Sequence, residues 1–158
     1  MQLFLSSYIN KIDKKGRVSI PAQFRNVLAS KNHQTIITYQ SFINNCIEAC
    51  APDRLEQLYS FIDNLDPFSE QKDAFATTIL GGSLMLNIDN DGRVCLPDFY
   101  VENLGLTENV TFVGKGNTFE LWNSEKFQEY SVKARNLALN SRDSLRNINM
   151  GGIKNDSK

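Results

Sequence analysis

The sequence DKKGRVSIP at residues 13–21 recurs as DNDGRVCLP at residues 89–97. Both stretches carry Asp, Gly, Arg, Val and Pro at matching positions, at an offset of 76 residues. A second match follows at an offset of 72, where CIEACAPDRLEQLY (46–59) aligns with TFELWNSEKFQEYS (118–131) and pairs Glu48 with Glu120. Repetition with gaps confined to a loop is typical of a duplicated fold. The sequence therefore predicts two tandem copies of one small module.

Each copy is expected to contain four short strands and one short helix. The first strand leads into Asp-x-x-Gly, a turn sequence, because Asp accepts backbone hydrogen bonds and Gly readily adopts a positive φ. The second strand ends at Pro21 or Pro97, and proline suits the first turn of a helix. The helices should end near Leu28 and near Leu104, where Gly105 follows as a stop signal. The expected strands lie at about 7–12, 18–20, 35–39 and 46–50, and at about 84–88, 94–96, 109–113 and 118–122.

Flanking segments complete the expected organisation. The linker pattern indicates two helices that break near Asp66, with Pro67 and Phe68 opening the second. Ser124 is a candidate N-cap for a C-terminal helix, and the chain beyond it ends in a polar stretch without periodicity. The expected parts are a first module at 5–52, a helical linker at 53–80, a second module at 81–124, a C-terminal helix at 125–140 and a disordered tail at 141–158.

The small size of each copy predicts a shared core. A unit of roughly 45 residues cannot bury enough apolar surface to offset its own chain entropy. The two copies must therefore pair with each other or interleave with a partner chain. The flanking helices carry apolar stripes that need covering, which favours further assembly. We expect a mainly β protein with helices, an α+β class, that forms oligomers.

Composition favours a cytoplasmic protein. Three cysteines among 158 residues do not suit a secreted disulfide framework. No segment approaches the roughly 20 apolar residues of a membrane span. The N-terminus lacks the pattern of a signal peptide. We therefore expect neither a membrane association nor an extracellular location.

No group of residues recommends catalysis. His33 is the single histidine and lies in a polar stretch without a partner at triad or metal-ligand spacing, so we expect a solvated loop residue. Cys46 and Cys50 share a face of a predicted strand, but a zinc site needs two further ligands, which favours core packing. Gly114-Lys-Gly116 lacks the setting of a phosphate loop and indicates a hairpin turn. The sequence predicts no enzyme, cofactor, metal site or small-molecule substrate.

The two copies differ in the net charge around their Asp-x-x-Gly turns. The chain as a whole carries a net charge of -1. Residues 11–25 hold five basic residues and one acidic residue, a net charge of +4, whereas residues 87–101 hold one basic residue and three acidic residues, a net charge of -2. A basic patch on one face can bind nucleic acid even when the whole protein is nearly neutral.

Two arginines, Arg17 and Arg93, are the best candidates for DNA recognition. Each follows the Gly of its turn and would be held on a two-stranded ribbon, which can enter the major groove, where Arg recognises guanine O6 and N7. Lys14 and Lys15 would lie beside phosphates, and Arg25 would contact a phosphate or brace the first helix. The alternative is that Asp13 and Asp89 merely form internal salt bridges with the arginines. Both roles can coexist, with Asp orienting the guanidinium.

The motifs resemble those of the MraZ family, bacterial transcriptional regulators with two AbrB/SpoVT-type modules. The resemblance rests on DKKGRVSIPAQFR (13–25), DNDGRVCLP and FVGKGNTFELW (112–122), in order, and covers about residues 4–138. It implies tandem swapped-hairpin half-barrels packed as one pseudo-symmetric unit. Asp13, Lys15 and Arg17 match the first family motif, and Asp89 and Arg93 the second. Copy two departs from copy one mainly at its turn, Asn90-Asp91, and at Val101, which stands in place of Arg25.

Two functions from different classes follow. The resemblance implies a nucleoid-associated repressor of its own cell-division and cell-wall operon, which assembles into a ring-like homo-oligomer and binds short direct repeats in double-stranded promoter DNA. Arg17 would contact bases, Lys14, Lys15 and Arg25 phosphates, and Arg93 would contribute less. Gly16 and Gly92 would shape the turns. The alternative is an AbrB-like protein-interaction or antitoxin-type module, which the acidic second copy favours.

Overall fold

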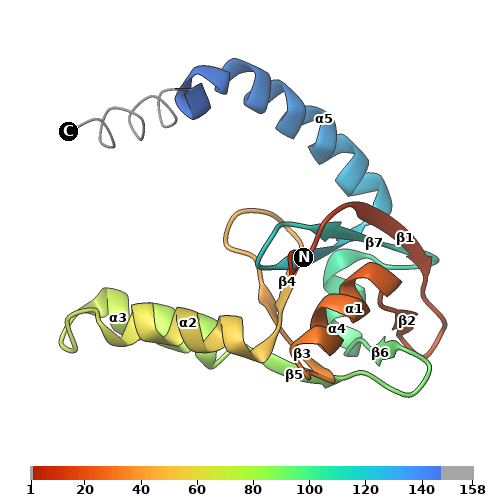
Figure 1. Ribbon diagram of the computed structural model, residues 1–158, viewed down its shortest axis with the longest axis horizontal. Coiled ribbons are helices and arrows are strands. Elements are labelled where there is room, and N and C mark those ends of the chain that lie inside the picture. Colours follow the sequence, from red (N-terminus) through yellow and green to blue (C-terminus); the bar gives the residue numbers. More distant parts are fainter. Residues whose placement is uncertain (1, 147–158) are drawn as a thin grey trace. The chain divides into compact units, whose positions relative to one another are not determined.

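The computed structural model describes residues 2–146 and has an α+β fold, as expected (Figure 1). The chain divides into two compact units, one ending at Ser124 and the other beginning at Glu125. The elements are β1 (Ser7–Lys11), β2 (Arg17–Ser19), α1 (Ala22–Ser30), β3 (Thr35–Gln40), β4 (Ile47–Cys50), α2 (Pro52–Asp63), α3 (Glu70–Phe75), a π-helix η1 (Ala76–Leu80), β5 (Leu84–Asn87), β6 (Arg93–Cys95), α4 (Asp98–Leu104), β7 (Asn109–Gly114), β8 (Phe119–Asn123) and α5 (Ser124–Asn140).

The two copies exchange strands within one chain. The larger sheet has six strands in the order β1-β7-β8-β4-β3-β5, and every pairing is antiparallel. At one edge β1 of copy one pairs with β7 of copy two, and at the other edge β5 of copy two pairs with β3 of copy one. Strands β4 and β8 meet at the centre, with Glu48 opposite Glu120. The shared core predicted from module size is thus formed by interleaving within the chain.

The second sheet is a short ribbon of two strands, β2 and β6, one from each copy. Val18 pairs with Val94 at its centre. Backbone hydrogen bonds extend the exchange beyond the strands, because the N–H of Ile20 donates to Gly92 O at 2.9 Å and the N–H of Leu96 donates to Gly16 O at 2.8 Å. Each Gly turn is therefore bound by the backbone of the other copy.

Aromatic side chains form the centre of the core. Phe24 of α1 is fully buried and its ring packs against Phe4, Tyr8, Phe112 and Phe119. Burial of large aromatic rings contributes strongly to the free energy of unfolding, and truncation of such a ring costs roughly 3–5 kcal/mol. The partners of Phe24 come from both copies, so the packing joins the copies in the same way as the strand pairing does.

The turns and helix ends follow the sequence prediction. Gly16 and Gly92 have φ angles of 83° and 78°, a region that Gly adopts without the strain of a Cβ. Pro21 and Pro97 precede the first residues of α1 and α4. Gly105 ends α4 in the left-handed conformation with φ of 65°, which is a common helix C-terminus.

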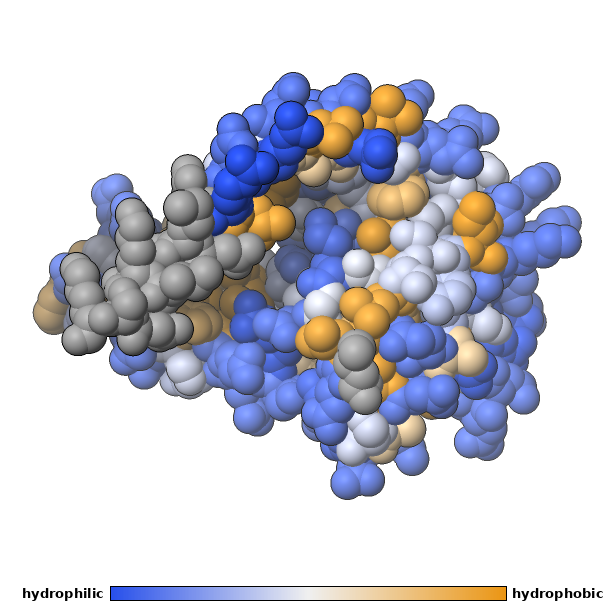
Figure 2. Space-filling view, turned by 45° about the horizontal axis from the view of Figure 1, so that its top comes forward, coloured by the Kyte–Doolittle hydropathy of each residue, from blue (hydrophilic) through white to orange (hydrophobic). Residues whose placement is uncertain are grey.

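The first linker helix, α2, begins at Pro52 near its predicted start, whereas the second begins slightly later than predicted and continues into the π-helix η1. Pro67 and Phe68 lie in a turn, where the N–H of Phe68 donates to Asp66 Oδ1 at 3.0 Å, and α3 starts at Glu70. Ser69 is the N-cap because its Oγ accepts the N–H of Lys72 at 3.1 Å. The linker helices expose large apolar side chains. The exposed side chains of this segment are Tyr59, Phe61, Phe68 and Phe75. The face of the molecule in Figure 2 is polar with scattered hydrophobic residues.

Helix α5 has 17 residues, and all of them except its first, Ser124, belong to the C-terminal unit. Residues 142–146 are also helical, which differs from the disorder expected for residues 141–158. Arg146 lies 4.0 Å from Asp143 in an i,i+3 pair, an arrangement that supports helix. The remainder of the expected tail, 147–158, lies outside the described residues. Over residues 2–146, no helix is long and apolar enough to cross a membrane.

Candidate nucleic-acid interface

The β2–β6 ribbon has one buried face and one solvent face. Val18 and Val94 are each 1% exposed and point into the core. Side chains alternate along a strand, and residues directly opposite each other in a pair share a face. The register places Arg17 opposite Cys95, and Arg93 opposite Ser19. The two arginines predicted as contacts therefore lie diagonally across the outer face of the ribbon.

Asp13 organises the first turn through one carboxylate. Its Oδ1 accepts the backbone N–H groups of Lys15 at 3.0 Å and Arg17 at 2.9 Å. Its Oδ2 accepts Nε–H of Arg17 at 2.7 Å. The N–H of Gly16 donates to the backbone oxygen of Asp13 at 3.1 Å and closes the turn. One side chain thus shapes the loop and fixes the guanidinium by its inner nitrogen.

Asp89 makes the same contacts at the second turn. Its Oδ1 accepts the N–H groups of Asp91 and Arg93, both at 2.9 Å, and its Oδ2 accepts Nε–H of Arg93 at 3.2 Å. One contact has no counterpart in copy one: Nη2 of Arg93 lies 3.2 Å from Asp91 Oδ2. Both predicted salt bridges are therefore present, and the second arginine is bound by two carboxylates.

Hydrogen bonding lowers the pKa of both turn carboxyls. For Asp13 the main cause is the backbone N–H of Arg17, and for Asp89 it is the backbone N–H of Arg93. A carboxylate that accepts several N–H bonds is favoured in its charged form. The guanidinium groups lower the pKa of both carboxyls further. Both carboxyls therefore keep their negative charge further into acid than an ordinary aspartate does.

The remaining basic candidates divide between the two turns. Lys14 and Lys15 are exposed on the first turn, as predicted. Arg25 projects from α1 and donates from Nε to Ile20 O at 3.0 Å. An ideal Cβ at Gly92 would lie 2.6 Å from Nη1 of Arg25, so the guanidinium packs directly on the second turn. Sequence position grouped Arg25 with the first basic patch, whereas strand exchange brings it to the turn of copy two.

The histidine and cysteines considered above as catalytic or metal-binding residues have contacts and burial that explain them as parts of the fold. Nε2 of His33 lies 3.6 Å from Asp53 Oδ1 and its side chain is 25% exposed, so the residue is less solvated than predicted. Cys46 and Cys50 are free and fully buried, and burial raises the pKa of each thiol to about 12. No cluster of three potential metal ligands occurs in the part of the chain that the structure describes. Lys115 closes the predicted hairpin between β7 and β8.

Sequence reasoning did not identify a polar cluster at the centre of the large sheet. Glu120 is 6% exposed, accepts Nε1–H of Trp122 at 2.9 Å and lies 3.7 Å from Nζ of Lys115. Glu48 is directly opposite on β4. Burial raises the pKa of the neighbouring Tyr39, and the charge of Glu48 adds to that shift. The sequence feature that could have indicated this cluster is the alignment of Glu48 with Glu120 in the repeat. The pairing of β4 with β8 places these two equivalent residues opposite each other.

The sequence is similar to known proteins over almost its whole length. The family model described as "MraZ protein, putative antitoxin-like" matches residues 79–147. A protein named "Transcriptional regulator MraZ" from Rickettsia bellii (strain OSU 85-389) is 47% identical over 150 residues, which is 94% of this chain and 100% of the relative. Relatives with the same name from Rickettsia canadensis (strain McKiel) and Rickettsia felis (strain ATCC VR-1525 / URRWXCal2) are 45% and 44% identical over 149 residues, again 94% of this chain and 100% of each relative. With the duplicated Asp–Arg turns and this coverage, the chain belongs to the MraZ family, whose relatives here are named transcriptional regulators.

Proposed function

We propose that the chain is a sequence-specific DNA-binding transcriptional regulator that places the β2–β6 ribbon in the major groove. The observation that carries the proposal is the presence of Arg17 and Arg93 on one solvent-facing side of a rigid two-stranded ribbon. A ribbon of this kind fits the major groove of B-DNA, and arginine discriminates guanine there through two hydrogen bonds. The names of the relatives agree with this role.

Arg17 is the main base-recognition residue in this proposal. Its Nε–H is engaged by Asp13, and within residues 2–146 no hydrogen bond or ion pair engages its two terminal nitrogens. These nitrogens remain available for guanine O6 and N7. Lys14 and Lys15 contact phosphates from the exposed first turn. Arg93 contributes less, because Asp91 already binds one of its terminal nitrogens.

Assembly would supply the affinity that a single patch lacks. Each chain offers only a small basic surface, and a homo-oligomer bound to evenly spaced direct repeats makes every later contact effectively intramolecular. The exposed aromatic side chains of α2 and α3 support such assembly, because contiguous exposed apolar surface often marks an interface. We infer that the ring-like oligomer occupies repeats in its own promoter and represses transcription in the cytoplasm, in association with the nucleoid.

One mutation tests DNA recognition. We expect Arg17→Ala to abolish specific binding to the DNA upstream of the protein's own gene while the oligomer stays intact. The measurement is a band shift at two salt concentrations, with size-exclusion chromatography for assembly. Arg135→Ala is the matched control, because it makes the same substitution at an exposed position of α5, far along the chain from the ribbon strands. Unchanged specific affinity in Arg17→Ala would refute the proposal.

The description of the family model favours a second candidate, an antitoxin-type module that binds a protein partner. An antitoxin commonly holds its toxin with an extension outside the DNA-binding fold, and residues 141–158 are the available extension. Deletion of these residues separates the two functions. A regulator of the proposed kind still binds its promoter DNA after the deletion, whereas an antitoxin-type module loses its protein partner.

A further inference from the structure

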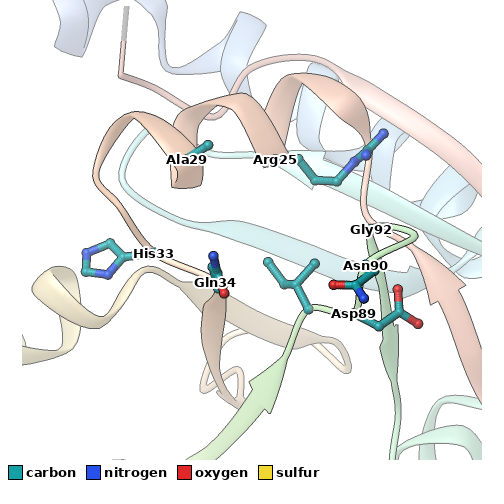
Figure 3. Close-up of a pocket in the computed structure, with 8 residues that line it drawn as sticks. Arg25, Ala29, His33, Gln34, Asp89, Asn90 and Gly92 are labelled. Atoms are coloured by element: carbon teal, nitrogen blue, oxygen red, sulfur yellow. The ribbon is translucent and has the colours of Figure 1, made fainter.

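Arg25 connects copy one to the turn of copy two. Its side chain leaves α1 on the side where Gly92 and Asn90 lie (Figure 3). Nε donates to Ile20 O at 3.0 Å, which anchors the inner part of the guanidinium. Nη1 occupies the space beside Gly92 that a side chain would need, 2.6 Å from an ideal Cβ. The terminal nitrogens of this residue are thus held at the second turn.

A groove of about 250 Å³ lies beneath this guanidinium. Its polar lining consists of Arg25, His33, Gln34, Asp89 and Asn90 (Figure 3). The carboxylate of Asp89 already accepts two backbone N–H groups and Nε–H of Arg93. The remaining polar side chains offer the amide N–H groups and oxygens of Gln34 and Asn90, the His33 ring, and the permanent positive charge of Arg25. The guanidinium and the amide N–H groups can bind an oxyanion, because the Asp89 carboxylate is already occupied by its N–H donors.

The second turn has no basic side chain of its own that could contact a phosphate at this end of the ribbon, apart from Arg93. Its turn carries Asn90 and Asp91 at the positions of Lys14 and Lys15, and residues 87–101 have a net charge of -2. Val101 stands where copy one has Arg25 and packs against the core. Only the guanidinium from copy one brings positive charge into the groove lined by this turn, among the residues that form it.

We propose that the groove beside the second turn binds a phosphate group of the DNA backbone, with Arg25 as its principal contact and the Asn90 amide as a second donor. The inference rests on the proposed DNA-binding function. Each end of the ribbon then has its own phosphate contact: the lysines of the turn itself at the first end, and an arginine from the other copy at the second. Phosphate contacts set the position of a protein on the duplex, which would hold Arg93 against the bases.

The salt dependence of DNA binding tests the proposal. In Arg25→Gln, we expect weaker binding to every duplex and a slope of log K against log salt that falls by about one, the signature of one lost phosphate contact. Asn90→Asp, at an exposed turn position, introduces a negative charge in the groove and should weaken binding without affecting the fold. Asn45→Asp is the matched control, because it makes the same change at an exposed loop position outside the groove.

The outcomes separate this inference from the function on which it rests. If the native chain binds and Arg17→Ala abolishes specificity, but Arg25→Gln and Asn90→Asp keep the native affinity and salt slope, the phosphate groove is refuted and the function stands. If the native chain shows no affinity for its promoter DNA, both fail. A folded Arg25→Gln chain, checked by its urea midpoint, excludes a general loss of structure as the cause of weaker binding.

A spectroscopic measurement distinguishes DNA phosphate from free phosphate. The Nε–H of Arg25 is hydrogen bonded, which favours its detection by NMR, and its signal is assigned by its absence in Arg25→Gln. We expect this signal to shift on titration with promoter duplex and to remain in place with inorganic phosphate at the same phosphate concentration. An equal shift with inorganic phosphate would assign the groove to free phosphate and overturn its role in DNA binding. A signal that both titrants leave unchanged would overturn the site altogether.

Discussion

The turns at Asp13 and Asp89 have the same backbone geometry in opposite electrostatic surroundings. In both, one carboxylate accepts two backbone N–H groups and the Nε–H of the arginine four residues later. The first turn presents Lys14 and Lys15, whereas the second presents Asn90 and an aspartate that binds Arg93. The turn geometry depends on Asp, Gly and backbone hydrogen bonds, so the exposed side chains between Asp and Gly can change charge without altering the fold. Duplication here preserves a shape and leaves its surface free to diverge.

The largest expected difference between the turns concerns their glycines. Both have positive φ, so an alanine at either position is strained by roughly 1–2 kcal/mol. A Cβ at Gly16 would lie 2.6 Å from the backbone oxygen of Leu96, whereas at Gly92 it would meet the flexible side chain of Arg25. We expect Gly16→Ala to lower the free energy of unfolding more than Gly92→Ala. Urea denaturation measures both.

A double variant sharpens the glycine comparison. In an Arg25→Ala background, the new Cβ of Gly92→Ala no longer meets the Arg25 side chain. The remaining loss in free energy of unfolding should then come only from the strain of the positive φ. Because Gly16 faces backbone of the other copy, the same Arg25→Ala change should leave the effect of Gly16→Ala untouched. Equal losses for Gly16→Ala and Gly92→Ala in the native background would contradict the contrast between a backbone and a side-chain neighbour.

The two arginines should differ in their effect on DNA affinity. We expect Arg93→Ala to weaken specific binding, but by much less than Arg17→Ala, because Asp91 competes for a terminal nitrogen of Arg93. Fluorescence anisotropy with a labelled promoter duplex gives both affinities under one salt condition. A loss in Arg93→Ala as large as in Arg17→Ala would show that the copies contribute equally.

A smaller effect is expected from removal of the competing carboxylate. Asp91→Asn takes one negative charge from an exposed position and releases Nη2 of Arg93. The backbone N–H of residue 91 still donates to Asp89, so the turn keeps its shape. We expect tighter DNA binding and a steeper salt dependence, both measured by titration at several salt concentrations. Weaker binding would mean that Asp91 orients Arg93 productively rather than competing with DNA.

The smallest expected effect is a loss of stability in acid, and both copies contribute to it. The folded-state pKa of both Asp13 and Asp89 is lowered, so each contributes stability that is present above the unfolded pKa of about 4 and is lost as pH falls through the folded value. Urea midpoints should therefore fall in acid. Asp13→Asn should be less stable than the native chain at neutral pH and approach it below about pH 4. A constant difference across this range would contradict the linkage.

Local features could be predicted from the sequence because their causes are local. Asp-x-x-Gly specifies its own turn, and Pro21, Pro97 and Gly105 mark helix boundaries through backbone geometry. Small differences arose where side chains compete for a helix start, as when Ser69 rather than Pro67 determined the beginning of α3. The expected module boundaries and the roles of the site residues remain predictions.

The partners of the strands could not be predicted in the same way. Module size required a shared core, but it left open pairing within the chain and interleaving with a partner, because neither alters the pattern of any single strand. Arg25 shows the consequence for the site. Its distance from each turn depends on which copy supplies the neighbouring strand, so its place beside Gly92 follows from the exchange and not from its position in the sequence.

The exchange of strands also dictates when the protein can fold. Strand β1 is synthesised early but pairs Ser7 with Val113, a residue that leaves the ribosome 106 positions later. Contacts of such long sequence separation slow folding, and until β7 emerges the edge of β1 has no partner. The first copy therefore cannot complete its sheet until β7 of the second copy has been synthesised. Any chain that stops before β7 therefore exposes an unpaired edge, which makes truncated products targets for aggregation or proteolysis, and a chain that stops before β6 cannot form the ribbon.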